Sequence, residues 1–334
     1  MRIFIFKLKQ IVIPTCICIF TFFLILFSSD NLSAAKNALF LWGTSVVPSL
    51  LPFFIATELL GYTNIVSILG KLLNKFMRPI FNVPGEGSFA LIMGILSGYP
   101  IGAKIVCNLK KQGICSNEEC ERLLAFTNNS GPLFIIGTVG VGLFSSSAIG
   151  FKLFFVHLFS CLLVGFIFRW WKCNKKFSFF WNRSQISCID ILSLNNLGAI
   201  LTTSIQNSIR LVLTIGGFVI LFSVIVSMLT SSKIIYIICT FINPFLNIFN
   251  IPEHYASSII TGIVEVTNGV KLASIYQNNI NIIICSFLLG FGGFSVLLQV
   301  LSITAEEKIS IKPYIIGKFL QACFSAIFMY FLLI

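Results

Sequence analysis

Apolar runs long enough to cross a lipid bilayer recur along almost the whole chain, and short clusters of lysine and arginine separate them. A helix needs about 20 predominantly apolar residues to cross the hydrocarbon core. Only 10% of the residues are charged, against about 25% in a soluble domain. Since no connection is long enough to fold separately, we predict a single all-α polytopic membrane domain over residues 1–334.

The positions of the basic residues predict how the chain threads the membrane. The net charge of +12 could indicate nucleic acid, but the lysines and arginines lie directly beside the apolar runs. Such clusters are typical of loops that stay in the cytoplasm. We therefore expect a multi-pass protein of the cytoplasmic (inner) membrane, in contact with the lipid bilayer and not with nucleic acid, with its N-terminus in the cytoplasm. Residues 11–27 resemble a signal peptide, but their length favours a retained span over cleavage.

We expect about seven full crossings, an amphipathic cytoplasmic segment over residues 65–81 and an outer segment over residues 234–249. The predicted crossings are residues 11–28, 38–62, 133–144, 150–171, 208–229, 280–301 and 314–334. The predicted parts are the N-terminal span and outer loop (1–37), a first repeat (38–171), a cytoplasmic amphipathic connector (172–207) and a second repeat (208–334).

Two further apolar stretches are too short to cross the membrane and are interrupted by residues that break helices. The first reaches Ser97-Gly-Tyr-Pro-Ile-Gly102 and resumes toward basic residues, so it is predicted to enter and leave from the cytoplasm as a re-entrant hairpin. The second, residues 255–276, is interrupted at Glu265-Val-Thr-Asn-Gly269. Non-helical backbone at membrane depth is tolerated only where protein or a water-filled cavity satisfies its polar groups.

A third interruption lies between these hairpins. Ser116 and Glu119 have the spacing of a capping box and predict the start of a helix. That helix is then broken at Thr127-Asn-Asn-Ser-Gly-Pro132 before the outward crossing is completed.

The two hairpins belong to two similar halves. Phe81-Asn-Val-Pro84 matches Phe249-Asn-Ile-Pro252, and at the same offset Gly94 matches Gly262. After a gap of one residue, Gly102 and Lys104 fall on Gly269 and Lys271. Because an odd number of crossings separates equivalent spans, we expect inverted repeats whose hairpin tips meet near the midplane, as around the substrate site of alternating-access carriers.

The motifs at these breaks resemble a known family. Phe81-Asn-Val-Pro-Gly85, Ser97-Gly-Tyr-Pro-Ile-Gly-Ala-Lys104, Glu121-Arg-Leu-Leu-Ala-Phe-Thr-Asn-Asn-Ser-Gly-Pro-Leu-Phe134 and Glu265-Val-Thr-Asn-Gly269 are similar to the sporulation integral membrane protein YlbJ family. That family belongs to the nucleoside-recognition Gate domain group, shared with concentrative nucleoside transporters and a ferrous-iron transporter. The resemblance covers about residues 40 to 330. It implies a transporter-like membrane protein of endospore-forming bacteria that is needed to form the spore cortex, with no settled substrate.

Polar residues at the breaks are the candidate substrate-binding residues. They are Ser97, Tyr99, Lys104, Asn128, Asn129, Ser130, Glu265, Thr267, Asn268 and Lys271. An acid at a mid-membrane break must pair, bind a cation or face water, so Glu265 leads this set. Its structural alternative is an ion pair with Lys104 or Lys271.

Each of the other candidates also has a structural alternative. Lys104 and Lys271 begin returning half-helices, where the helix dipole favours an anion, or else they neutralise Glu265 or extend to an interface. Asn and Ser at breaks also form turns and caps without any ligand. Two residues within spans lie outside the breaks: Glu58 is a candidate proton relay or a packing residue, and His157 is predicted to be a packing residue.

Two functions stay open from the sequence. The first is a carrier for a small polar or anionic solute, and the alternative is a non-transporting scaffold whose partners are other sporulation membrane proteins. No enzyme is predicted, because the chain has no nucleophile elbow, HExxH motif or phosphate loop. With two histidines and scattered cysteines, no metal and no cofactor is predicted either.

Overall fold

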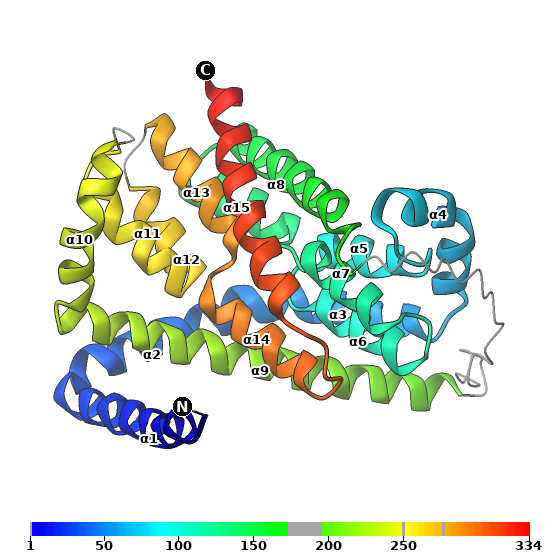
Figure 1. Cartoon of the computed structure of the whole chain (residues 1–334), viewed down its shortest axis with the longest axis horizontal. Helices are drawn as coiled ribbons and strands as arrows, with labels where there is room; N and C mark the ends of the chain where they lie inside the picture. Colours follow the sequence, from blue (N-terminus) through cyan, green and yellow to red (C-terminus); the bar gives the residue numbers. More distant parts are fainter. Residues whose placement is uncertain (1, 173–195, 249–250, 276–277) are drawn as a thin grey trace.

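The computed structural model describes residues 2–172, 196–248, 251–275 and 278–334, which are helical and contain no strand (Figure 1). The helices in chain order are α1 (Arg2–Leu26), α2 (Ser28–Leu41), the π-helical η1 (Trp42–Val46), α3 (Val47–Gly61), α4 (Ile65–Phe81), α5 (Gly87–Leu96), α6 (Ile101–Lys111), α7 (Asn117–Thr127), the π-helical η2 (Leu133–Leu143), α8 (Ser147–Phe168), α9 (Leu197–Ser231), α10 (Ile234–Ile248), α11 (Tyr255–Val264), α12 (Val266–Ala273), α13 (Asn279–Phe291), α14 (Gly293–Ala305) and α15 (Lys312–Leu333).

Several of these helices meet the requirements for crossing a bilayer. Within the described ranges, four are long and apolar enough: α8, α9, the α13–α14 pair and α15. The number rises to six if two bent pairs each count as one span, namely α1 with α2, bent by 95°, and α3 with α4, bent by 84°. The all-helical, multi-pass architecture is therefore as predicted, while the number of seven crossings stays a prediction.

Local sequence chemistry explains most element boundaries. α4 begins and ends at the predicted residues, and the first hairpin breaks between Leu96 and Ile101 as expected. The capping box at the start of α7 is confirmed: the Ser116 hydroxyl accepts from the Glu119 N–H at 3.2 Å, and the Glu119 carboxylate accepts from the Ser116 N–H at 2.9 Å. These two reciprocal bonds satisfy backbone donors that the helix itself cannot pair.

Three boundaries differ from the predictions. The outer loop predicted before residue 38 is helical, because α2 runs from Ser28 to Leu41. α9 begins at Leu197, not at residue 208, so its 35 residues extend about 52 Å, well beyond a hydrocarbon core of about 30 Å. The span predicted over residues 280–301 is divided at Gly292, where both Gly292 and Gly293 have φ of +80°, a conformation that favours glycine. Residues 173–195 of the predicted connector lie outside the described residues.

The order of elements from α3 to α8 recurs from α9 to α15. Each series consists of two helices, two hairpin half-helices, an interrupted span and a final helix of 22 residues. The repeat itself stays a prediction. Phe249 and Asn250 of the matching motif lie outside the described residues, and the inversion of the two halves stays a prediction.

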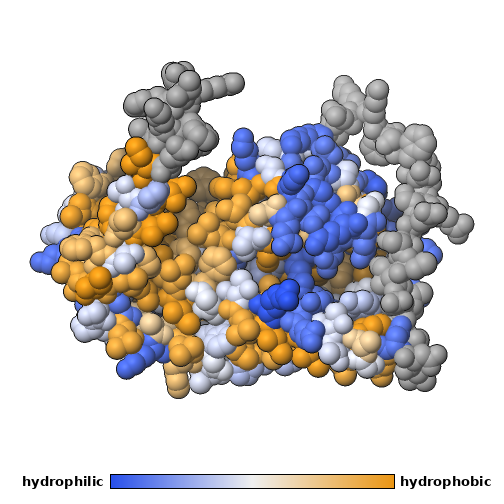
Figure 2. All heavy atoms as spheres, turned by 90° about the horizontal axis from the view of Figure 1, so that it is seen from below, coloured by the Kyte–Doolittle hydropathy of each residue, from blue (hydrophilic) through white to orange (hydrophobic). Residues whose placement is uncertain are grey.

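The helices pack so that apolar side chains cover much of the outside. α2, η1 and α3 lie along α9, and α15 crosses the centre of the molecule against α7, α8 and α13 (Figure 1). Large apolar side chains such as Phe155, Phe241 and Phe331 are exposed. Figure 2 shows apolar residues over most of one side of the lower face and hydrophilic residues gathered on the other. Such apolar exposure suits contact with lipid.

Candidate functional site

The tip of the first hairpin lies directly on the break between α7 and η2. A Cβ placed on Gly94 would be 1.8 Å from the Thr127 carbonyl oxygen, and one on Gly102 would be 2.2 Å from the same atom. At the tip, Gly98 has φ of +80° and approaches the backbone of Gly131. Only glycine permits backbones to come this close, so these residues hold the two breaks of the first half together.

The second hairpin is built in the same way. A Cβ on Gly269 would be 2.1 Å from the Gly262 Cα, and one on Gly293 would be 3.2 Å from the Gly262 oxygen and from the Val266 nitrogen. The tip of α11 and α12 therefore packs on the α13–α14 break. Gly262 and Gly269 are the residues that the sequence aligned with Gly94 and Gly102, and both pairs lie where hairpin arms touch.

A buried polar cluster lies where the α7–η2 break meets α15. The cluster can form because Gly317 on α15 lies against Ala125 of α7, with a built Cβ only 2.5 Å from the Ala125 oxygen. The Asn129 Oδ1 accepts from the Gln321 Nε2 at 3.0 Å and from the Lys318 Nζ at 3.4 Å. Lys318 also donates to the Gln321 Oε1 at 2.9 Å.

His157 of α8 closes one side of this cluster. Its Nε2 accepts from the Ser130 backbone N–H at 3.4 Å and lies 3.4 Å from the Gln321 Nε2. Asn129 also contacts α8, since its Nδ2 lies 3.3 Å from the Cys161 Sγ. The cluster therefore joins the first half, through the break and α8, to the last helix of the second half.

Tyr99 extends the polar region to the tip of the second hairpin. Its hydroxyl lies beside Ser130 and within electrostatic range of the Glu265 carboxylate. Next to it, the Asn128 Nδ2 donates to the Tyr314 hydroxyl at 3.2 Å. Among the described residues, the Asn128 Oδ1 is buried without a hydrogen-bond partner. Five sequence candidates, namely Tyr99, Asn128, Asn129, Ser130 and Glu265, are thus brought together.

Glu265 caps the second half-helix of its hairpin. Its carboxylate accepts from the backbone N–H groups of Thr267 at 3.0 Å and Asn268 at 2.8 Å. Within the described chain it forms no ion pair, so the alternative of a salt bridge to Lys104 or Lys271 is wrong. The carboxylate takes the place at the helix N-terminus where an anionic ligand was expected.

The remaining candidates lie away from the cluster. Lys104 forms an ion pair with Glu58 of α3 at 2.5 Å, while Lys271 is exposed. Ser97 lies 3.3 Å from the Thr57 hydroxyl. Lys104 and Lys271 therefore do not neutralise Glu265, and Glu58 has a structural partner. The side chains of Thr267 and Asn268 are partly exposed, and both residues contribute backbone donors to the cap.

The polar face of α15 was not predicted from the sequence. Tyr314, Lys318, Gln321 and Ser325 are separated by four, three and four residues, so they lie on one side of the helix, and each is at most 3% exposed. This spacing within an apolar span was the signal that could have found them. His157, predicted to be a packing residue, contacts the cluster.

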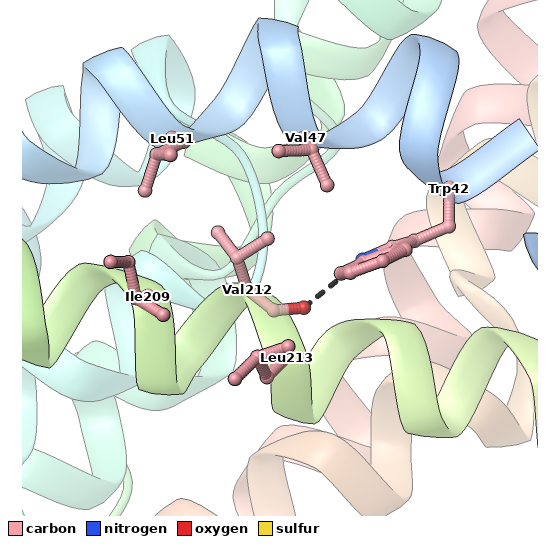
Figure 3. Close-up of a pocket in the computed structure, with 6 residues that line it drawn as sticks. All are labelled: Trp42, Val47, Leu51, Ile209, Val212 and Leu213. Carbon is pink, nitrogen blue, oxygen red and sulfur yellow. Dashed lines mark hydrogen bonds between the residues drawn. The ribbon is translucent and has the colours of Figure 1, made fainter.

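A separate recess lies between the N-terminal helices and α9 (Figure 3). Its lining residues are Trp42, Val47, Leu51, Ile209, Val212 and Leu213. The only polar side-chain group in this lining is the Trp42 indole N–H, which donates to the Val212 carbonyl at 3.1 Å. The recess therefore offers no free polar group to orient a solute. No three His, Cys, Asp or Glu side chains of the described residues gather as a metal site requires.

Comparison with known proteins identifies the family. The chain is 36% identical over 337 residues to the sporulation integral membrane protein YlbJ of Bacillus subtilis (strain 168), and the match covers 96% of this chain and 82% of that protein. The chain belongs to the YlbJ family. A Gate family profile, described as nucleoside recognition, matches residues 44–169 of this YlbJ-family chain, from η1 to the end of α8. No solved structure matches the chain.

Proposed function

We propose that this protein binds a small polar or anionic solute at the buried cluster and moves it across the cytoplasmic membrane during spore cortex formation. The observation that carries the proposal is the burial of Asn128, Asn129, Ser130, Lys318 and Gln321 together at the meeting of both halves. Buried polar groups inside a membrane protein are costly, and they commonly mark solute or ion pathways. The name of the YlbJ relative motivates the link to sporulation.

The arrangement of the breaks supports alternating access. In each half, a hairpin lies on the break of the following span: Gly94 and Gly102 approach Thr127 in the first half, and Gly262 approaches Gly293 in the second. Paired broken helices in two halves are typical of secondary transporters, whose solute sites lie at the interface of inverted repeats. The proposal includes this inversion, about seven crossings, a cytoplasmic N-terminus and no enzymatic activity.

In the experiment, the chromosomal gene for this protein in an endospore-forming bacterium is replaced by genes that encode variants of it. We expect Glu265→Gln and Asn128→Ala to reach the membrane in normal amount and to produce few heat-resistant spores. Membrane yield and the thermal unfolding of purified protein check that the variants fold. Wild-type spore heat resistance in both variants would refute the proposal.

A second variant set tests the scaffold alternative, in which the protein recruits other sporulation membrane proteins through its cytoplasmic surface. This set is Lys175→Gln with Lys176→Gln, in the segment predicted as the cytoplasmic connector. The carrier proposal expects normal heat resistance from this set, whereas the scaffold predicts a loss here and none at Glu265 or Asn128.

A further inference from the structure

Lys318 is a buried cation without a counter-ion in the part of the chain that the structure describes. The residue is 3% exposed, and its Nζ donates to two neutral amide oxygens, the Gln321 Oε1 and the Asn129 Oδ1. None of the ion pairs among the described residues includes it. Burying an ammonium without a paired anion is strongly unfavourable, so this position lacks its electrostatic complement.

The same cluster holds a second hydrogen-bond donor in excess. Because the His157 Nε2 accepts from the Ser130 backbone N–H, the neutral ring carries its proton on Nδ1. That Nδ1 is buried and, among the described residues, has no hydrogen-bond partner. In the described part of the chain, the Lys318 ammonium has two recorded hydrogen bonds, to the two amide oxygens, and three hydrogens to donate. An imidazole N–H and an ammonium N–H of one buried cluster therefore each lack a recorded hydrogen-bond partner.

The carboxylate of Glu265 does not serve as the counter-ion of Lys318. It is held by the N-terminus of α12 and forms no ion pair with Lys318. The polar region therefore has a capped carboxyl group at Glu265 and an unpaired ammonium at Lys318. An anionic group entering this region is attracted at the Lys318 end.

We infer that Lys318 and His157, supported by Asn129 and Gln321, bind the carboxylate or phosphate group of a small anionic solute. This inference rests on the proposed function and names the class of its solute. An oxyanion provides both the missing charge and acceptors for the two donors, whereas a neutral polar solute provides acceptors alone. The Asn129–Gln321 hydrogen bond holds the two sides of the site in place.

The test measures the thermal unfolding of the purified full-length protein in detergent. The probes are inorganic phosphate, acetate and glycerol 3-phosphate, with ionic strength held constant by sodium chloride and glycerol as the neutral comparison. A ligand that binds only the folded state raises the unfolding temperature in a saturating manner. We expect such a rise with at least one of the three anions and none with glycerol. No rise with any anion overturns the inference.

Two variants locate the site. Lys318→Gln removes the charge and should weaken the anion response by about tenfold or more. Lys312→Gln, at an exposed position on the same helix, should keep the wild-type response. An equal response in wild type and Lys318→Gln overturns the inference.

Asn129→Asp keeps the inference testable if Lys318→Gln does not fold. The new carboxylate lies where Lys318 already contacts the amide oxygen, so it replaces the anion from within the protein. We expect a higher unfolding temperature without any anion and a lost anion response. A less stable protein with a wild-type anion response contradicts the inference. If these binding results fail while Glu265→Gln still prevents heat-resistant spores, the anionic class is wrong and the proposed function stands.

Discussion

Replacing Gly269 by alanine should separate the two arms of the second hairpin. The added Cβ would be 2.1 Å from the Gly262 Cα, 2.4 Å from the Gly262 nitrogen and 2.9 Å from the Ser258 oxygen. All three are backbone atoms, so no side chain can rotate away. To restore van der Waals contact, α12 and α11 must move apart by about 1 Å, which disturbs the packing around the Glu265 cap.

Two opposing contributions determine how much Gly269→Ala changes the free energy of unfolding. Alanine is favoured over glycine inside a helix by about 0.5–1 kcal/mol. Overpacking a well-packed interior costs about 1–3 kcal/mol and sometimes more, and a clash against backbone alone lies at the upper end. The net loss for Gly269→Ala is therefore about 2 kcal/mol. For a chain of this size, that corresponds to a fall in Tm of about 3 °C.

The assay follows tryptophan fluorescence of the purified protein during heating, with Gly217→Ala as the matched control. Gly217 lies in the long helix α9 and has no atom within 4 Å of a built Cβ, so this variant should be unchanged or slightly more stable. Gly102→Ala, whose Cβ would be 2.2 Å from the Thr127 oxygen, should lose stability as Gly269→Ala does. A Gly269→Ala protein as stable as wild type would show that the arms of the hairpin do not touch.

Three further stability changes follow from the contacts, each measured by thermal unfolding. Glu265→Ala removes the cap of α12 and should cost about 1 kcal/mol, while Glu265→Gln, which keeps an acceptor, should cost less; equal losses would contradict the capping role. Glu121 is 3% exposed and accepts from Lys172 at 2.9 Å, so Glu121→Gln should lose about 1–3 kcal/mol, and an unchanged Tm would refute this. Glu58→Gln and Lys104→Gln remove the same ion pair, so the double variant should lose less than the sum of the single losses; strict additivity would refute the pairing.

Helix ends were predictable where the chemistry is local. The Ser116–Glu119 capping box and the glycine-proline break before Ile101 each act through residues close in sequence, and both occur as expected. The break at Gly292 was missed because apolar residues flank it on both sides and hydropathy alone predicts an unbroken span. Its φ of +80° depends on the packing of Gly293 against the second hairpin, a contact between residues distant in the chain.

The site residues also fall into those that local sequence predicts and those that depend on contacts distant in the chain. Tyr99, Asn128 and Asn129 were found because they adjoin helix breaks, where polar residues are conspicuous. Lys318 lies inside an unbroken apolar helix, where a single lysine is compatible with a side chain that extends to the membrane surface. Its burial follows from the close approach of α15 to α7 at Gly317, which no local pattern encodes. Lys104, in contrast, had a suitable position in sequence but pairs with Glu58.

Under the proposed carrier function, the hydrogen bonds between Asn129 and α15 would have a mechanical role as well as a chemical one. Asn129 belongs to the break in the first half, whereas Lys318 and Gln321 belong to the last helix of the second half. In a carrier that alternates its access, one half moves against the other, so these are the bonds that such a movement must stretch or break. An anion held by Lys318 and His157 would bridge α15 and α8 at the same place. Binding of the solute would then stabilise the closed arrangement, and its release would free the two halves to move.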